Sequence, residues 1–155
     1  NELRNKGWSI PDEAALSGLR NVIRNTGFAG RWQRLDGIPA TIVDVAHNED
    51  GIRAMLAQLA LTKYRALHIV LGMVNDKDVG KVLSLLPRSA TYYYCKADIP
   101  RGMDALQLRA SGATHQLVGK AYSSVATALQ AARNSAAAED LVVVTGSVFV
   151  VAEVL

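Results

Sequence analysis

The chain has 155 residues, half of them hydrophobic, which is enough for one ordinary domain with its own core. No uninterrupted apolar run approaches membrane-spanning length and no secretory leader opens the chain, so we expect neither a membrane partner nor export. The formal charge of +3 is small and spread along the chain, which suits anionic small ligands and does not indicate nucleic acid.

The only cysteine, Cys95, stands in a strand-like run and has no partner for an intramolecular disulfide. This pattern predicts a buried packing residue in a reducing compartment, and we expect a cytoplasmic protein. The chain opens on Asn-Glu-Leu rather than on methionine, so we expect it to be part of a longer protein.

The first predicted element is a helix over residues 11–26. Ser9 is the expected cap, Pro11 falls in the first turn, and Gly27 is a typical C-terminal stop. The helix has one apolar face, which needs a partner. We therefore expect residues 1–28 to be a linker or the end of a preceding domain, and residues 29–155 to form the domain itself.

The next stretch predicts a β-hairpin. An apolar strand over residues 40–43 ends abruptly at Asp44, and Arg31 lies across an Asp36-Gly37 turn from that strand. The hairpin would bring an arginine and a carboxylate onto one small segment.

After the hairpin, helical and strand-like stretches alternate with short connections. The predicted helices cover 49–61, 104–110, 123–138 and 148–155, and one more helix is capped by Asn75 or Asp76 and ends at Leu86. The predicted strands cover 67–72, 91–95, 114–118 and 141–144. Gly112 is expected to end a helix and Gly119 to form a turn, while His68 and His115 are expected to pack within strands. Because the strands are mostly continuous apolar runs, they indicate an α/β fold: a Rossmann-like, mostly parallel sheet with an antiparallel edge strand and helices on both faces.

Polar side chains gather where strand 40–43 meets the next helix. Asp44, His47 and Asn48 stand there, and ligands of α/β sheets bind at the carboxyl ends of strands. A carboxylate in this place can accept hydrogen bonds from ribose hydroxyls, and an imidazole can deprotonate an ammonium group near neutral pH. A turn aspartate and a structural histidine are the alternatives.

Two further candidates follow other strands. Lys77 stands at a helix start, where a cation is mildly unfavourable and so invites an anionic partner, unless Asp76 or Asp78 neutralises it. For Ser147, an ordinary N-cap is one interpretation, and it is compatible with a second, because helix N-terminal amides with a hydroxyl can also bind an anion.

Four short motifs in this order resemble one family. G-R-W-Q at 30–33, D-V-A-H-N at 44–48, D-K-D at 76–78 and T-G-S-V-F at 145–149 are similar to the C-terminal domain of folylpolyglutamate synthase/dihydrofolate synthase, in the Mur ligase superfamily. The resemblance covers about residues 8–155. It implies an ATP-dependent amide ligase that adds L-glutamate to dihydropteroate, to folates or to both through an acyl phosphate.

The resemblance also implies a role for each candidate. It assigns ATP to Arg31 and Asp44, the catalytic role to His47 and the glutamate and acyl phosphate region to three others, namely Asn48, Lys77 and Ser147. It implies that the phosphate loop and the Mg²⁺ ligands lie in an N-terminal domain outside this chain. The isolated chain is therefore expected to be folded but inactive.

Three other interpretations remain open. The chain could belong to a Mur-type ligase of a cell-wall precursor, or be a non-catalytic nucleotide-binding module. It could also be an interaction domain whose helix 11–26 docks on a partner.

Overall fold

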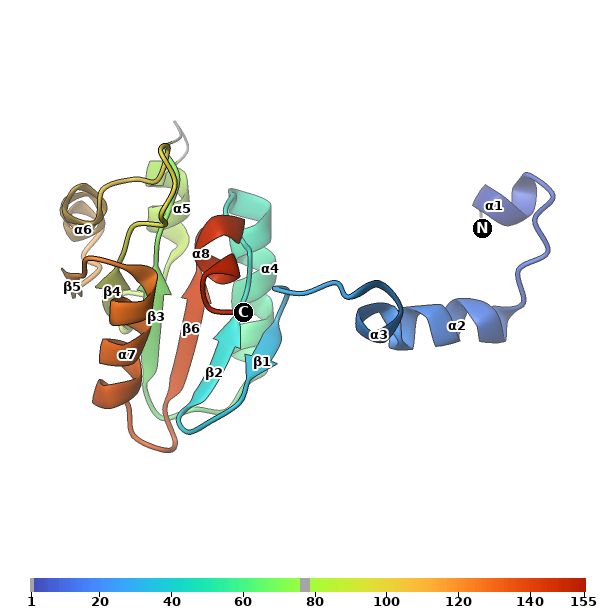
Figure 1. Ribbon diagram of the computed structural model, residues 1–155, viewed down its shortest axis with the longest axis horizontal. Helices are drawn as coiled ribbons and strands as arrows, with labels where there is room; N and C mark the ends of the chain where they lie inside the picture. Colours follow the sequence, from blue (N-terminus) through green and yellow to red (C-terminus); the bar gives the residue numbers. More distant parts are fainter. Residues whose placement is uncertain (1, 76–78) are drawn as a thin grey trace.

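A six-stranded sheet forms the centre of the computed structural model, which describes residues 2–75 and 79–155 (Figure 1). Its strands are β1 (Gln33–Leu35), β2 (Ala40–Val43), β3 (Leu67–Leu71), β4 (Thr91–Tyr94), β5 (Gly119–Ala121) and β6 (Leu141–Thr145). Their order is β1-β2-β6-β3-β4-β5, and only β1 runs antiparallel to its neighbour. The predicted sheet with one antiparallel edge strand is therefore confirmed.

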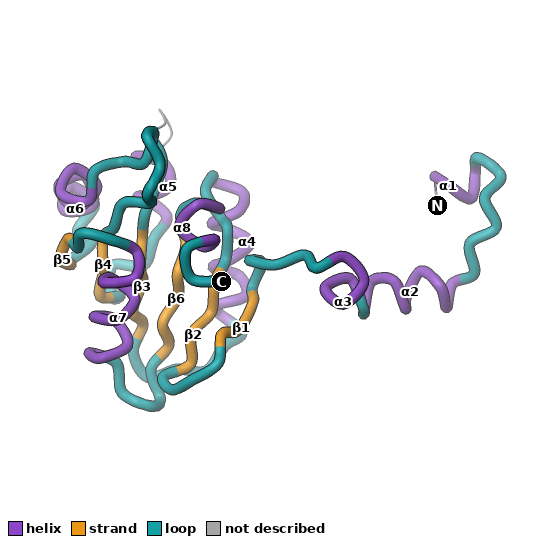
Figure 2. The backbone as a smooth tube through the Cα atoms, in the orientation of Figure 1, coloured by secondary structure: helices purple, strands orange, loops and turns teal. Residues whose placement is uncertain are grey.

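Helices cover both faces of this sheet (Figure 2). One face carries α4 (Glu49–Ala60), α5 (Val79–Leu85) and α6 (Ala105–Thr114), and the other carries α7 (Val125–Ser135) and α8 (Val148–Ala152). Side chains alternate along each strand, so Ile69 enters the first core and Val70 the second. Both cores need apolar residues at every position of a central strand, which explains the continuous apolar runs.

The N-terminal segment projects away from the sheet as α1 (Glu2–Asn5), α2 (Asp12–Arg20) and α3 (Val22–Thr26) (Figure 1). The single helix predicted over 11–26 is wrong, because the chain breaks at Asn21, whose side-chain amide donates to the carbonyl of Ser17 at 2.9 Å. The predicted Ser9 cap is wrong as well, since α2 begins after Pro11 without a side-chain cap. No residue of these three helices is buried.

Helix α6 continues beyond the predicted stop at Gly112 and ends at Thr114, where His115 follows as C-cap rather than as a strand residue. Gly112 has a packing role instead, since a Cβ there would collide with the Tyr94 hydroxyl. The predicted strand over 114–118 is therefore wrong.

The fifth strand begins at Gly119, which was expected to form a turn. Here too the glycine allows a close approach, because a Cβ would collide with the Tyr92 carbonyl oxygen of the neighbouring strand. The other predicted helices and strands after the hairpin are confirmed, with ends shifted by at most three residues. The predicted start of the helix that ends near Leu86 lies outside the described residues.

Cys95 is free and buried, as predicted. Burial raises the pKa of its thiol to about 12, with a smaller contribution from Glu153, so the thiol stays protonated and unreactive. In the part of the chain that the structure describes, no helix has the length and apolarity needed to cross a membrane.

Candidate ligand site at the carboxyl edge of the sheet

Two adjacent strands, β2 and β6, deliver candidate residues to one edge of the sheet. Asp44 follows β2 and Ser147 comes shortly after β6, which lies between β2 and β3. Backbone hydrogen bonds tie these strand ends together, from Asp44 N to the Val144 carbonyl at 3.0 Å and from Gly146 N to the Ala46 carbonyl at 3.0 Å. Lys77 belongs to the segment after β3 and lies outside the described residues, so its role stays a prediction.

The Asp44 carboxylate organises the loop between the hairpin and α4. Its Oδ2 accepts from Trp32 N and its Oδ1 from Ala46 N, both at 2.9 Å. These contacts hold Trp32 at a φ of 44°, which is unusual for a non-glycine residue. Asp44 thus has the turn role that was the alternative reading. Each oxygen keeps a second lone pair, so the carboxylate can still accept a hydrogen bond from a ligand.

Arg31 lies on the same end of the hairpin and is exposed. Its guanidinium carbon lies 5.6 Å from the centroid of the Phe28 ring, a cation–π distance. Nearby, Gly30 N donates to Gln33 Oε1 at 2.8 Å, which fixes the backbone beneath the arginine. Within the described residues no carboxylate pairs with Arg31, so its charge is available to an anion.

The imidazole of His47 is exposed, and its Nδ1 lies 3.0 Å from the Val45 carbonyl oxygen. A carbonyl can only accept, so this bond places a proton on Nδ1. In the neutral ring Nε2 then carries the lone pair that can accept a proton. Asn48 has a structural role as the N-cap of α4, since its Oδ1 accepts from Gly51 N at 2.9 Å.

Ser147 is only 3% exposed and begins α8, with its Oγ accepting from Phe149 N at 3.2 Å. Its hydroxyl hydrogen remains free to donate. The neighbouring Thr145 donates its hydroxyl to the Ala46 carbonyl at 3.3 Å and so serves to join β6 to the Asp44 loop.

The sequence reasoning missed Arg101, which reaches the same edge from the loop after β4. Its guanidinium carbon lies 5.2 Å from the centroid of the Phe149 ring on α8. The Arg101 carbonyl accepts from Asn75 N at 3.0 Å, and Met103 N donates to the Met73 carbonyl at 2.8 Å. The signal that pointed to Asp44, a polar residue in the segment that follows a strand, is also present for Arg101, which follows β4.

The described residues include no group of three or more His, Cys, Asp or Glu side chains that could hold a metal ion. The edge instead offers two exposed arginines, a partly buried carboxylate and an exposed imidazole. This set is suited to binding anions and moving a proton.

Residues 30–148 match the family model of the Mur ligase, glutamate ligase domain, and the chain belongs to this family. Within it, the dihydrofolate synthase/folylpolyglutamate synthase of Escherichia coli (strain K12) is 36% identical over 155 aligned residues, covering 99% of this chain and 35% of the relative. The resemblance found in the sequence motifs is thereby confirmed.

Solved structures give the same result. The structure of E. coli FolC in complex with DHPP and ADP superposes with a TM-score of 0.82 and 34% identity, covering 98% of this chain and 35% of that one. A bifunctional folylpolyglutamate synthase/dihydrofolate synthase with Mn, AMPPNP and L-glutamate bound gives a TM-score of 0.81 and 32% identity, covering 98% and 36%. The chain thus spans about a third of the length of these relatives.

Proposed function

We propose that this chain is the C-terminal domain of an ATP-dependent amide ligase that adds L-glutamate to dihydropteroate, to folates or to both. One observation carries the proposal: a free arginine, a carboxylate and an imidazole with an available Nε2 meet at the ends of adjacent strands, in a family of glutamate ligase domains. The relatives named above bind ADP, AMPPNP and L-glutamate, which supports the same ligands here.

Arg31 and Asp44 are the residues that we assign to ATP. A guanidinium binds two phosphate oxygens at once through its planar fork and stays charged at every working pH. The remaining lone pairs of Asp44 suit ribose hydroxyls, and the two amide bonds that hold its carboxylate keep it in place for them.

The reaction that we propose has two steps. The γ-phosphoryl group of ATP passes to the carboxylate of the pterin substrate. This step forms an acyl phosphate and releases ADP. The amine of glutamate then attacks the acyl carbon, an amide bond forms, and inorganic phosphate departs. The amine must lose a proton first, and Nε2 of His47 is placed to accept it.

Glutamate brings two carboxylates as well as its amine. Arg101 supplies a cation beside α8, and the buried Ser147 hydroxyl supplies a donor at the start of that helix. Lys77 remains our candidate for a second cation, and Asn48 positions the start of α4 next to His47.

Residues 1–28 would connect this domain to a preceding one. Apolar side chains of α2 and α3 are exposed, among them Leu19 at 74% and Ile23 at 58%, as expected of helices that lose their partner with that domain. The preceding domain would supply the phosphate loop and the ligands of Mg²⁺, which helps to neutralise phosphate charge in such reactions. The isolated chain would then be inactive, and the full-length enzyme would work in the cytoplasm.

The proposal is tested with His47→Ala in the full-length enzyme, by glutamate-dependent ADP release with dihydropteroate as substrate. We expect kcat to fall by about 100-fold or more, the usual contribution of a general base, with the KM for ATP little changed. His115→Ala, at the end of α6, is the matched control and should behave as wild type. Full activity of His47→Ala, or a wild-type enzyme that accepts only cell-wall precursors, would refute the assignment.

A further inference from the structure

A hollow lies at the opposite, amino end of the strands, on the face that carries α7. Its volume is about 440 Å³, which is in the range of small-molecule sites. Helix α7 packs on β3, β4 and β6, and the same side of the edge strand β5 stays partly uncovered. The β4–β5 register sets Tyr93 opposite Lys120, so both side chains project toward this hollow.

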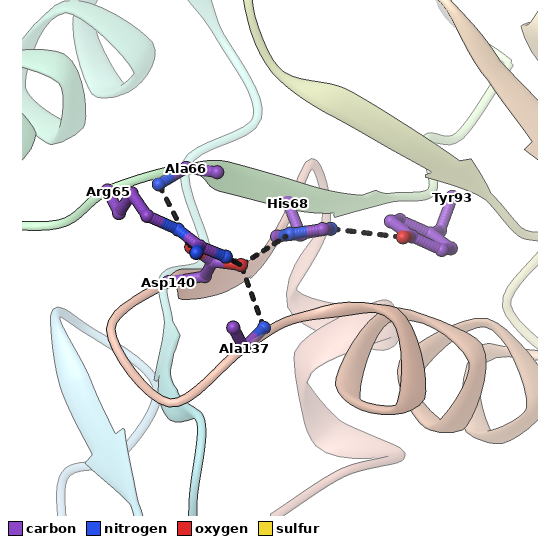
Figure 3. A network of polar contacts seen from close by, with 6 residues as sticks. All are labelled: Arg65, Ala66, His68, Tyr93, Ala137 and Asp140. Carbon is purple, nitrogen blue, oxygen red and sulfur yellow. Dashed lines mark hydrogen bonds and ion pairs between the residues drawn. The ribbon is translucent and has the colours of Figure 1, made fainter.

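Two tyrosines form an aromatic wall of the hollow. The rings of Tyr93 and Tyr122 stack with their centroids 5.7 Å apart and an interplanar angle of 27°. Tyr93 is held from behind, because its hydroxyl lies 3.0 Å from Nδ1 of the buried His68 (Figure 3). Nε2 of His68 faces the ionised Asp140 at 3.5 Å, which favours the proton on Nε2 and leaves Nδ1 to accept from Tyr93.

Asp140 anchors this chain of contacts to the backbone. Its carboxylate accepts from Arg65 Nε at 3.0 Å and Nη2 at 3.2 Å, and from the amides of Ala66 at 3.1 Å and Ala137 at 2.8 Å (Figure 3). The Arg65 hydrogen bonds first, and the Ala137 amide second, lower the pKa of Asp140 to about 2. These contacts hold Tyr93 in place through His68, and Arg65 compensates the charge of Asp140, which does not line the hollow.

Several polar side chains of the hollow have no polar partner within the described part of the chain. The Lys120 ammonium pairs with no carboxylate there, and no carboxylate lines the hollow. The hydroxyls of Thr91, Tyr122 and Ser135 line it too, and none of them makes a hydrogen bond to the described residues. A cation, three hydroxyls and a stacked aromatic wall without an acid are complementary to a flat molecule that carries a negative charge.

We propose that this hollow binds a small planar anion of the aromatic carboxylate class. The ring would lie against Tyr122, which stacks on the buried Tyr93, and the carboxylate would meet Lys120 at the mouth. Neither the proposed ATP site nor the proposed glutamate site takes part, because both lie at the other end of the strands.

Benzoate is the probe, compared with benzamide, which keeps the ring without the charge, and acetate, which keeps the charge without the ring. Binding is followed by chemical shifts of backbone amides in the ¹⁵N-labelled chain. We expect benzoate to shift the amides of residues 91–93 and 118–122 with a dissociation constant on the order of 1 mM, in line with so small a ligand. Each control probe should bind about fivefold more weakly, because acetate loses the contact with the aromatic ring and benzamide loses the ion pair with Lys120, for which about fivefold is the upper end of the range for an exposed pair.

Two variants test separately how much the cation and the aromatic wall contribute to benzoate binding. Lys120→Gln should weaken benzoate binding by about fivefold, and Tyr122→Leu should abolish its preference over acetate. Lys96→Gln, an exposed lysine beyond the other end of β4, is the matched control and should leave binding unchanged. Unchanged spectra outside the hollow establish that each variant is folded. The proposal is overturned if benzoate causes no shifts, shifts other residues, or binds Lys120→Gln as well as Lys96→Gln.

Discussion

Asp44 is the residue at which structure and proposed function overlap most closely, because the carboxylate that we assign to ATP also closes the loop around it. Asp44→Ala removes two hydrogen bonds from backbone amides and should lower the free energy of unfolding by about 1–3 kcal/mol. In the full-length enzyme it should also raise the KM for ATP or lower turnover more than about tenfold, equivalent to about 1.4 kcal/mol.

Gln33→Ala provides the control for that variant. It removes the side chain that accepts from Gly30 N and so loosens the same loop without removing the Asp44 carboxylate. Equilibrium unfolding in urea and steady-state kinetics are measured for both variants. A direct contact with ATP predicts a kinetic loss for Asp44→Ala well beyond that for Gln33→Ala. Equal kinetic losses would mean that Asp44 acts only through the loop.

The chemistry of single residues was only partly predictable from the sequence. The strand end at Asp44 and the turn at Asp36-Gly37 are local signals, and the structure brings Arg31 and Asp44 together as the hairpin requires. The contact between Arg101 and Phe149 joins two segments far apart in the chain. No local pattern encodes such a contact, since it depends on the order of the strands.

At the scale of elements, glycines caused the clearest errors. A glycine that ends a helix and a glycine that lets another group approach look the same in a sequence. Gly112 and Gly119 belong to the second kind, because Tyr94 and Tyr92 occupy the space that their side chains would fill. The helix boundary and the fifth strand therefore depended on tertiary packing, whereas the caps at Asn48 and Ser147 agree with local rules.

The turn from β6 into α8 depends on Gly146. This residue has a φ of 100°, and an added Cβ would collide with the Gly72 carbonyl oxygen and lie 2.8 Å from Leu71 Cδ1. Gly146→Ala should destabilise the fold by about 1–3 kcal/mol or more, the cost of backbone strain before any collision is counted. Urea unfolding measures the change.

The control is Gly80→Ala on α5, where a Cβ meets nothing within 4 Å. This variant should be neutral or more stable by up to about 1 kcal/mol, because alanine favours helix more than glycine does. If Gly146→Ala were as stable as Gly80→Ala, the turn would not need its glycine.

At the scale of the whole molecule, sequence periodicity predicted the layers but not the path of the chain. Continuous apolar runs indicated a sheet buried on both faces, and two cores were found. The placement of β6 between β2 and β3 has no local signal, although it is what joins Asp44 and Ser147 at one edge. The family resemblance implied only that Asp44 and Ser147 serve the same reaction, and neither it nor the composition and periodicity of the residues gave the strand order.

The domain should fold without the N-terminal segment. Helices α1, α2 and α3 bury no residue, so deleting residues 1–27 should change the free energy of unfolding by no more than about 0.5 kcal/mol. The m-value, which is the slope of that free energy against urea concentration, should also stay nearly constant. The m-value scales with the surface that unfolding exposes. The deletion retains Phe28 and thus its contact with Arg31.

Val151→Ala serves as the reference for this deletion, since Val151 is fully buried in the core beneath α7 and α8 and its truncation should cost about 1–3 kcal/mol. A deletion that costs more than Val151→Ala would show that the N-terminal segment packs on the domain, and the boundary at residue 28 would then be wrong. A deletion without cost would instead leave the exposed apolar side chains of α2 and α3 without a structural role inside this domain. Their surface would then be available to the preceding domain that we propose, which would have to close over Arg31, Asp44 and His47 to complete the site.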